Sequence, residues 1–521
     1  MPIRMEEDPR NEGRNNNNRG GGGGGGLAKL LPLIFLFVFK KPKIAIPILA
    51  IAAVWYFFFG GKEMFNGGEN LNYQDTQNYQ GDYTFGATLD DQKYRETEIF
   101  EPLAYGSDGT PTRYSLEKFA PRRLNQGPQG SCVGWASAYA ARTILHAQST
   151  GQNPNSAAFS PSFLYNYIAL PNSNCQGSYL PDAMQFMKQN GALPLQTFPY
   201  DPSTCRIGAT DQQKNQASQF RTRGYQRLTL SRSQRSPDIR AIRQYIAKGG
   251  PVVIGMEVGG TFMTPMEGQR MWYPTRNDYA RRGYGGHAMC VIGYDDNMEG
   301  GAFQIMNSWG PQWGENGIAW VRYKDFQEFV MEAYGLYPMG NYVEQNKDQL
   351  GVRFALVTNE GQQQIPLNYQ GGNFFRTQQP LRKGTRFKIA VDNTTECYTY
   401  VFGMETDGSS YVLFPYTSKH SPYCGLTGVR LFPRDFSMVP DDVGSSDVLA
   451  VVVSKRALDF NQLNSAINGA RGGNYAEKLN NALGGRLIQG VQYQGGNSVS
   501  FDGKINGQRD AVAIVMAIDK R

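Results

Sequence analysis

The stretch Asn125–Trp135, which reads NQGPQGSCVGW, decides the fold that this sequence predicts. It places Cys132 at the start of a predicted helix, Val133–Gln148, six residues after Gln126. A thiol at a helix N-terminus lies against the positive end of the backbone dipole, and its pKa falls further beside a protonated imidazole. Cys132 is therefore a candidate nucleophile, and the next requirement is a base.

Only three histidines could serve as that base: His146, His287 and His420. His287 lies in YGGHAMCVIGYDD, where two glycines precede an alternating run of small and large apolar residues that predicts a buried strand. Asn307 follows another short apolar run, and a hairpin-like return would bring its side-chain oxygen to the imidazole. Cys132, His287 and Asn307 therefore form a candidate nucleophile, base and orienting group.

These motifs resemble the papain-like cysteine proteases, the C1 peptidase family, over roughly Tyr114–Tyr337. Asn307 begins an Asn-Ser-Trp-Gly motif that is followed by Trp-Gly-Glu-Asn-Gly, and the order Cys, His, Asn fits the family. The resemblance implies that Gln126 and the backbone amide of Cys132 form the oxyanion hole. It also implies that Trp309 shields the bond between the asparagine and the histidine from water.

The resemblance extends to the substrate groove. Cys175 lies in NCQGSY, which is similar to the family segment whose backbone lines that groove. A glycine directly before the catalytic histidine is a further family feature. The candidate substrate-binding residues are therefore Gly177, Ser178, Gly286 and Trp309.

The remaining cysteines divide into free thiols and candidate disulfides. Cys205 stands where the family has a downstream partner for Cys175, so the resemblance implies a bridge between these two. Once Cys132 and Cys290 are assigned as free, the second candidate pair is Cys397 and Cys424. Two positions depart from the family pattern: Val133 replaces an aromatic residue, and Gln129 replaces a cysteine, so one family disulfide cannot form.

The N-terminal part differs in composition from the rest. Residues 1–26 are rich in Arg, Asn and Gly and predict a disordered cytoplasmic tail. Residues 27–61 hold two apolar runs, Leu30–Phe39 and Ile44–Phe59. Extended through Gly61, the second run is 18 residues long. Such a helix measures about 27 Å, which predicts one transmembrane helix at 44–61.

The charges around this helix predict its orientation. Lys40, Lys41 and Lys43 precede it, so the positive-inside rule keeps the tail cytoplasmic and exports everything after Lys62. A cleavable signal peptide is the rival interpretation, which the bulky run Trp55–Phe59 disfavours. The first apolar run is either interfacial or the partner of a short hairpin. We expect a single-pass protein of the bacterial inner membrane with its catalytic domain in the periplasm.

The exported part predicts a stalk and two domains. Residues 62–114 are polar and predict a stalk, without the amphipathic helical propeptide that papain-like zymogens usually carry. Residues 115–338 show helices first and strands later, which predicts an α+β domain of two lobes. Residues 342–521 show short alternating runs and predict a β-sandwich with a helical insert at Leu463–Leu483. One predicted strand, Cys397–Met404, contains Tyr398-Thr-Tyr-Val-Phe-Gly and is followed by Asp407-Gly408 and Leu413-Phe414-Pro415. These residues loosely resemble β-domains found beside bacterial envelope proteases, and we expect this domain to bind or position an envelope protein partner.

Composition excludes several other functions. The net charge of +7 is modest, and no nucleic-acid-binding motif is present. The three scattered histidines give no metal-ligand spacing, and no cofactor is expected. The sequence therefore predicts a membrane-anchored cysteine endopeptidase acting on polypeptides. A transpeptidase that uses the same residues and a catalytically silent peptide-binding scaffold remain as alternatives.

Overall fold

The computed structural model describes residues 3–8, 83–104, 109–228, 236–339, 348–493, 496 and 498–521. The predicted transmembrane helix at 44–61, the first apolar run, most of the predicted tail and residues 62–82 of the predicted stalk lie outside this set. Among the described residues, no helix is long and apolar enough to cross a membrane.

The helical lobe of the first domain is built around the predicted nucleophile helix, which is confirmed. It begins as α6 (Cys132–Gly134), continues as a π-helical stretch (Trp135–Arg142) and ends as α7 (Thr143–Thr150). Gly151 ends it in the left-handed conformation, with φ 71°, where glycine carries no steric penalty. The other helices of the domain are α8 (Pro161–Ile168), α9 (Leu180–Gln189), α10 (Asp211–Ala217), α11 (Ile239–Ala247) and α12 (Tyr323–Phe329).

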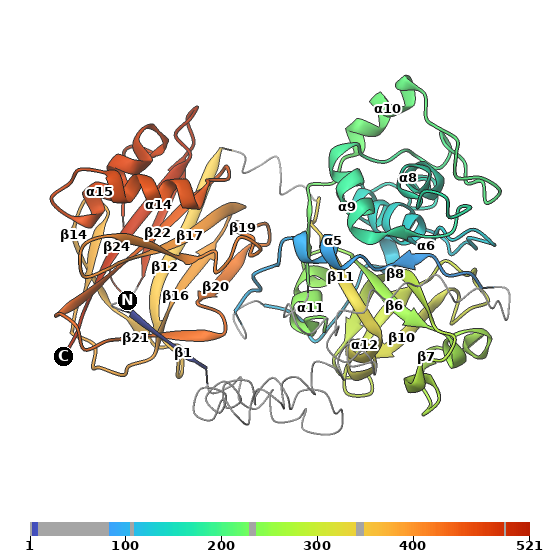
Figure 1. Cartoon of the computed structure of the whole chain (residues 1–521), viewed down its shortest axis with the longest axis horizontal. Helices are drawn as coiled ribbons and strands as arrows, with labels where there is room; N and C mark the ends of the chain where they lie inside the picture. Colours follow the sequence, from blue (N-terminus) through green and yellow to red (C-terminus); the bar gives the residue numbers. More distant parts are fainter. Residues whose placement is uncertain are drawn as a thin grey trace, which may run out of the picture. The chain divides into compact units, whose positions relative to one another are not determined.

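A strongly twisted sheet forms the second lobe (Figure 1). Within the described residues it has eight strands, in the order β5-β11-β6-β8-β9-β10-β7, with β3 paired to β8. Its central strand, β8, carries His287 and is buried almost throughout because both faces are covered. The strands are β3 (Arg113–Ser115), β5 (Tyr225–Arg227), β6 (Val252–Val258), β7 (Met271–Trp272), β8 (Gly285–Asp295), β9 (Ala302–Met306), β10 (Ile318–Arg322) and β11 (Val330–Leu336).

The predicted β-sandwich is confirmed as two sheets, each with seven strands within the described residues. The first has the order β1-β21-β16-β12-β13, with β20 and β23 beside it, and the second has the order β14-β15-β24-β22-β17-β18, with β19. The first sheet contains β1 (Ile3–Glu7), β12 (Gln349–Thr358), β13 (Gln364–Ile365), β16 (Phe387–Asn393), β20 (Gly428–Phe432), β21 (Phe436–Pro440) and β23 (Val499–Lys504). The second contains β14 (Leu367–Gly371), β15 (Phe374–Thr377), β17 (Cys397–Met404), β18 (Ser410–Phe414), β19 (Tyr423–Cys424), β22 (Ser446–Ser454) and β24 (Ala511–Asp519).

The β-domain has three layers: the first sheet, the second sheet and a pair of helices. Side chains of β22, in the second sheet, point alternately to the two outer layers. Val451 and Val453 face the first sheet, whereas Ala450 and Val452 face the opposite way, as the two-residue period of a strand requires. The outward side chains pack against the predicted helical insert, which forms α14 (Phe460–Gly469) and α15 (Tyr475–Leu483). Both helices lie over the second sheet in Figure 1.

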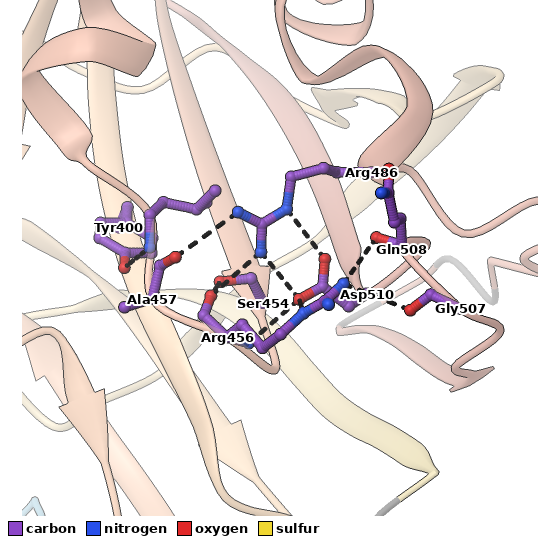
Figure 2. Close-up of polar contacts among 9 residues, drawn as sticks. Tyr400, Ser454, Arg456, Ala457, Arg486, Gly507, Gln508 and Asp510 are labelled. Carbon is purple, nitrogen blue, oxygen red and sulfur yellow. Dashed lines mark hydrogen bonds and ion pairs between the residues drawn. The ribbon is translucent and has the colours of Figure 1, made fainter.

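An ion-pair cluster around one buried carboxylate joins the ends of β22 and β24 in this domain (Figure 2). Asp510 has a side chain that is 1% exposed, and its carboxylate accepts hydrogen bonds from Arg456 and Arg486. Both arginines also donate to backbone carbonyl groups nearby. The cluster therefore stabilises the loops at this end of the sandwich, because a buried carboxylate requires paired charge and hydrogen bonds.

Three expectations from the sequence are wrong. Residues Ile3–Glu7 of the predicted disordered tail form an edge strand of the first sheet, where Ile3 is buried. Residues 83–104 of the predicted stalk fold against the first domain, because they carry buried apolar side chains. Cys397 and Cys424 face each other across β17 and β19 but are free thiols. The Cys175–Cys205 bridge, in contrast, is confirmed.

Candidate active site

The start of helix α6 fixes the position of Cys132. Cys132 is the first residue of this helix, and its thiol accepts a hydrogen bond from the backbone N–H of Ala288 at 3.4 Å. Ala288 directly follows His287 on β8, so this bond holds the sulfur against the strand that carries the predicted base. The structure therefore brings Cys132 and His287, 155 residues apart in the sequence, into one site at the junction of the two lobes.

The orientation of His287 is fixed by Asn307, as the sequence predicts. Nε2 of His287 lies 2.7 Å from Oδ1 of Asn307. The same oxygen accepts the backbone N–H of Ser308 at 2.7 Å, which fixes the orientation of the amide. Because an amide oxygen can only accept, Nε2 carries the hydrogen and Nδ1 holds the lone pair. Nδ1 has no hydrogen-bond partner among the described residues, so it is available to take a proton.

Trp309 covers this histidine. Its ring stacks on the imidazole of His287 with centroids 4.2 Å apart and an interplanar angle of 25°. Both side chains are almost fully buried. The indole therefore excludes water from the bond between His287 and Asn307, and exclusion of water strengthens that bond.

Gln126, the predicted oxyanion donor, is buried and is tied to the residue that follows Asn307. Its side-chain oxygen accepts the hydroxyl of Ser308 at 2.7 Å, which leaves the amide nitrogen as the group aimed into the site. That nitrogen donates to the carbonyl of Gln129 at 3.0 Å and to the carbonyl of Thr84 at 3.3 Å. A carbonyl oxygen from a distant part of the chain is therefore already bound to the predicted oxyanion donor.

Thr84 belongs to a stretch that contacts the predicted substrate-binding residues, residues 83–88, here called the groove segment. The indole N–H of Trp309 donates to the Thr84 carbonyl at 3.1 Å, and the ring of Tyr83 stacks on Trp309 at 4.8 Å. Gly86 donates its N–H to the carbonyl of Gly286 at 3.1 Å and accepts the N–H of Ser178 at 3.0 Å.

Two short strands continue the contact. The strand β2 (Ala87–Thr88) pairs in parallel with β4 (Ser178–Tyr179). Of the four predicted substrate-binding residues, Ser178, Gly286 and Trp309 therefore bind the chain's own backbone. Those three contacts are with the groove segment, whereas Gly177 donates its N–H to the carbonyl of Gly130 and to the hydroxyl of Tyr165.

The fit between the groove segment and the groove depends on glycines. A Cβ added to Gly86 would lie 2.2 Å from the carbonyl oxygen of Gly130, and one added to Gly286 would lie 2.0 Å from the carbonyl oxygen of Ala87. Real Cβ atoms do not approach backbone oxygens so closely. Only glycine at these positions lets the two backbones meet, and this close packing leaves Cys132 and His287 with no exposed surface.

Burial determines the charge state of the closed site. Removal from water raises the pKa of the Cys132 thiol to about 12, against which the hydrogen bond from Ala288 acts only weakly. Removal from water also lowers the pKa of His287 to about 4, although the bond to Asn307 opposes this shift. Both groups are therefore neutral at neutral pH while the groove segment is in place.

Part of this chain is similar in sequence to known proteins. Residues 117–339 match the papain family cysteine proteases. They form a papain-family cysteine protease domain. Similar proteins include mouse cathepsin K, which is 26% identical over 232 residues, covering 44% of this chain and 64% of the relative. A peptidase C1-like protein of Acanthamoeba polyphaga mimivirus is 28% identical over 207 residues, covering 39% of this chain and 64% of the relative.

The chain spans less than two thirds of the length of these relatives. Among solved structures, xylellain, a cysteine protease from Xylella fastidiosa, is matched at 21% identity and a TM-score of 0.40. That comparison covers 50% of this chain and 98% of the xylellain chain.

The first prediction concerns access to the thiol. In the variant Gly86→Leu, the clash with the Gly130 carbonyl should displace the groove segment at a cost of about 1–3 kcal/mol. Since 1.4 kcal/mol is a factor of ten, an epoxysuccinyl probe should label Cys132 about 10- to 100-fold faster than in the unmodified chain. Peptide mapping identifies the labelled cysteine. The matched control is Gly208→Leu, at an exposed glycine with open space around it. Equal labelling rates in both variants would contradict the prediction.

The second prediction concerns ionisation. At neutral pH the unmodified chain should show no thiolate ultraviolet absorbance from Cys132, because burial raises the pKa of that thiol to about 12. The Gly86→Leu variant should show the absorbance of one thiolate. Water that enters the opened site stabilises the thiolate of Cys132 beside the imidazolium of His287. Subtraction of the spectrum of the matching Cys132→Ser variant isolates the signal. A full thiolate signal in the unmodified chain would show that the closed site is already ionised.

Proposed function

We propose that this protein is a latent cysteine endopeptidase that cleaves polypeptides outside the cytoplasm and is anchored to a membrane by its N-terminal region. The observation that carries the catalytic part is the bond of 2.7 Å between His287 and Asn307, placed under Trp309 and beside Cys132. Nucleophile, base and orienting group meet there, as acyl transfer by a thiol requires.

Each residue has a separate role in the proposed reaction. Nδ1 of His287 accepts the thiol proton of Cys132, and the thiolate attacks the scissile carbonyl carbon. The resulting oxyanion is bound by the side-chain amide of Gln126 and the backbone N–H of Cys132. The imidazolium then protonates the leaving amine, and Asn307 keeps the ring in position throughout. Water, activated by the neutral imidazole, releases the acyl group.

The path of the groove segment favours an endopeptidase. The segment enters beside Trp309, passes Gly130 and leaves along β4, so the groove accepts a chain that continues in both directions. No terminal group of the peptide is needed for these contacts. The same segment supports latency, because a substrate cannot bind to Gln126, Ser178 or Gly286 until it is displaced.

The membrane anchor and the periplasmic location rest on the sequence of residues 27–61. One observation acts against a single crossing: β1 (Ile3–Glu7) lies in a sheet of the β-domain, although a single span would separate the tail from the exported domains. In the alternative, the two apolar runs form a hairpin, and the tail and the two domains then lie on the same side of the membrane. Binding of an envelope protein by the β-domain is also part of this proposal.

The third prediction tests the chemistry in the opened Gly86→Leu chain. That variant should hydrolyse an unstructured protein substrate, and Cys132→Ser in the same background should abolish the activity. Gln126→Ala should lower kcat by about 10²-fold, because one oxyanion donor is lost. Mass spectrometry of the products separates hydrolysis from ligation to an added amine. Ligation as the main outcome would favour the transpeptidase, and a reactive thiol without turnover would favour the scaffold.

The fourth prediction tests the topology. Single cysteines are introduced at Asn16 in the tail and at Asn277, an exposed residue of the protease domain. In intact spheroplasts, a membrane-impermeant maleimide should label the cysteine at position 277 and should reach position 16 only after lysis. Labelling at both positions before lysis would replace the single crossing by a hairpin anchor.

A further inference from the structure

A second part of the predicted stalk, residues 98–104 (the linking segment), binds to the β-domain. The backbone of Ile99 forms two hydrogen bonds with it: its N–H donates to the carbonyl of Lys419 at 2.8 Å, and its carbonyl accepts the N–H of Ser421 at 3.0 Å. The hydroxyl of Ser421 donates to the carboxylate of Glu98 at 2.6 Å. These are the contacts of an added strand, in which main-chain bonds supply the binding.

The contact continues at the other end of the linking segment. The N–H of Ala104 donates to the carbonyl of Val429 at 2.7 Å, and the guanidinium of Arg430 donates to the carbonyl of Glu101 at 3.1 Å. Leu103 packs so closely on Gly428 that a Cβ added to this glycine would lie 3.3 Å from both methyl groups of the leucine. The β-domain therefore holds the linking segment at both ends.

The opposite face of the linking segment binds the protease domain. Phe100 and Glu98 form backbone hydrogen bonds with Arg227 of β5, at 3.1 and 2.9 Å. Gln244 of α11 binds both backbone groups of Leu103 at 3.0 Å. As a result Phe100 and Leu103 are almost fully buried. The linking segment lies between the β-domain and the protease domain. Loss of its contacts with the β-domain should therefore weaken its binding to the protease domain.

The linking segment and the groove segment are close in sequence. They are joined by Leu89–Thr97, most of which forms the helix α5 (Asp91–Glu96). This helix is itself docked, because Lys93 forms an ion pair of 2.6 Å with Asp182. A short tether raises the effective concentration of the segment attached to it. While the linking segment is bound, Leu89–Thr97 therefore keeps the groove segment close to the active site.

We propose that the β-domain surface formed by Lys419–Ser421 and Gly428–Arg430 is a binding site for an extended peptide, that its ligand is residues 98–104 of this chain, and that its occupancy keeps the protease closed. The regulatory part rests on the proposed function. An extended peptide that competes for this surface therefore activates the enzyme, and the β-domain is the part of the chain that receives the activating signal.

The fifth prediction uses two substitutions that face the linking segment from the β-domain. In the full chain, Ser421→Ala removes the bond to Glu98, and Gly428→Ala pushes against Leu103. Together they should increase amide hydrogen exchange at Ile99 and also at Ala87 and Thr88 of β2. They should speed epoxysuccinyl labelling of Cys132 about tenfold.

The matched control is the double variant Ser409→Ala and Gly444→Ala. Ser409 donates an equally short hydrogen bond of 2.6 Å to a carboxylate, and Gly444 is a positive-φ glycine of the same domain with open space around it. This control should leave exchange and labelling unchanged. Faster exchange at Ile99 with full protection at Ala87 and Thr88 would overturn the regulatory part of the proposal.

A peptide tests the binding surface without any substitution. The synthetic peptide TEIFEPLA, residues 97–104, should speed exchange at Ala87 and Thr88 when added to the full chain, and a scrambled peptide should not. If TEIFEPLA and the scrambled peptide had the same effect on exchange at Ala87 and Thr88 of the unmodified chain, the assignment of the surface would be overturned. Hydrogen exchange reports these results whether or not Gly86→Leu cleaves a substrate, so failure of the peptidase proposal is recognised separately.

Discussion

The close approach of two backbones, at Gly86 and Gly130, is the constraint on which the closed site depends. With 2.2 Å between a hypothetical Cβ and the opposing carbonyl oxygen, there is no space there for any side chain. The contact brings the groove segment within hydrogen-bonding distance of Ser178 and Gly286 and excludes water from Cys132. The polar backbone groups of the groove are then satisfied by the chain itself, which is the requirement for burying them.

The protease fold was largely predictable because its signals are local. The predicted nucleophile helix, Val133–Gln148, lies within the observed helix Cys132–Thr150, and the buried strand predicted at His287 is β8. The contact between Asn307 and His287 was also predictable, because a short β8–β9 connection must return the chain to the start of β8. In the β-domain, β17 was predicted from its alternating aromatic and aliphatic residues at Cys397–Met404.

The occupied groove could not be predicted from the same signals. Residues 83–88 bind mainly through backbone carbonyl and N–H groups, which every sequence has, and they form only the two-residue strand β2. The only available signals were Gly86 between Phe85 and Ala87, and the apolar residues Ile99, Phe100 and Leu103 within a stretch taken as polar. Such residues buried in a predicted stalk indicate that it folds onto a partner. The edge strand β1 was missed for a similar reason, because five residues in a tail rich in Arg, Asn and Gly carry too little pattern.

The proposed latency is electrostatic as well as steric. A thiol with a pKa near 12 and an imidazole with a pKa near 4 cannot exchange a proton favourably, so the closed site holds a neutral pair. Transfer of the proton from Cys132 to His287 creates two charges, and water must enter to stabilise them. Displacement of the groove segment lets water and substrate enter together. The same movement therefore allows the thiolate to form and brings the scissile peptide bond to it. A thiol kept neutral until then is also protected from oxidation, because the thiolate is the reactive form. This protection matters in an oxidising compartment, in which the Cys175–Cys205 bridge would be stable.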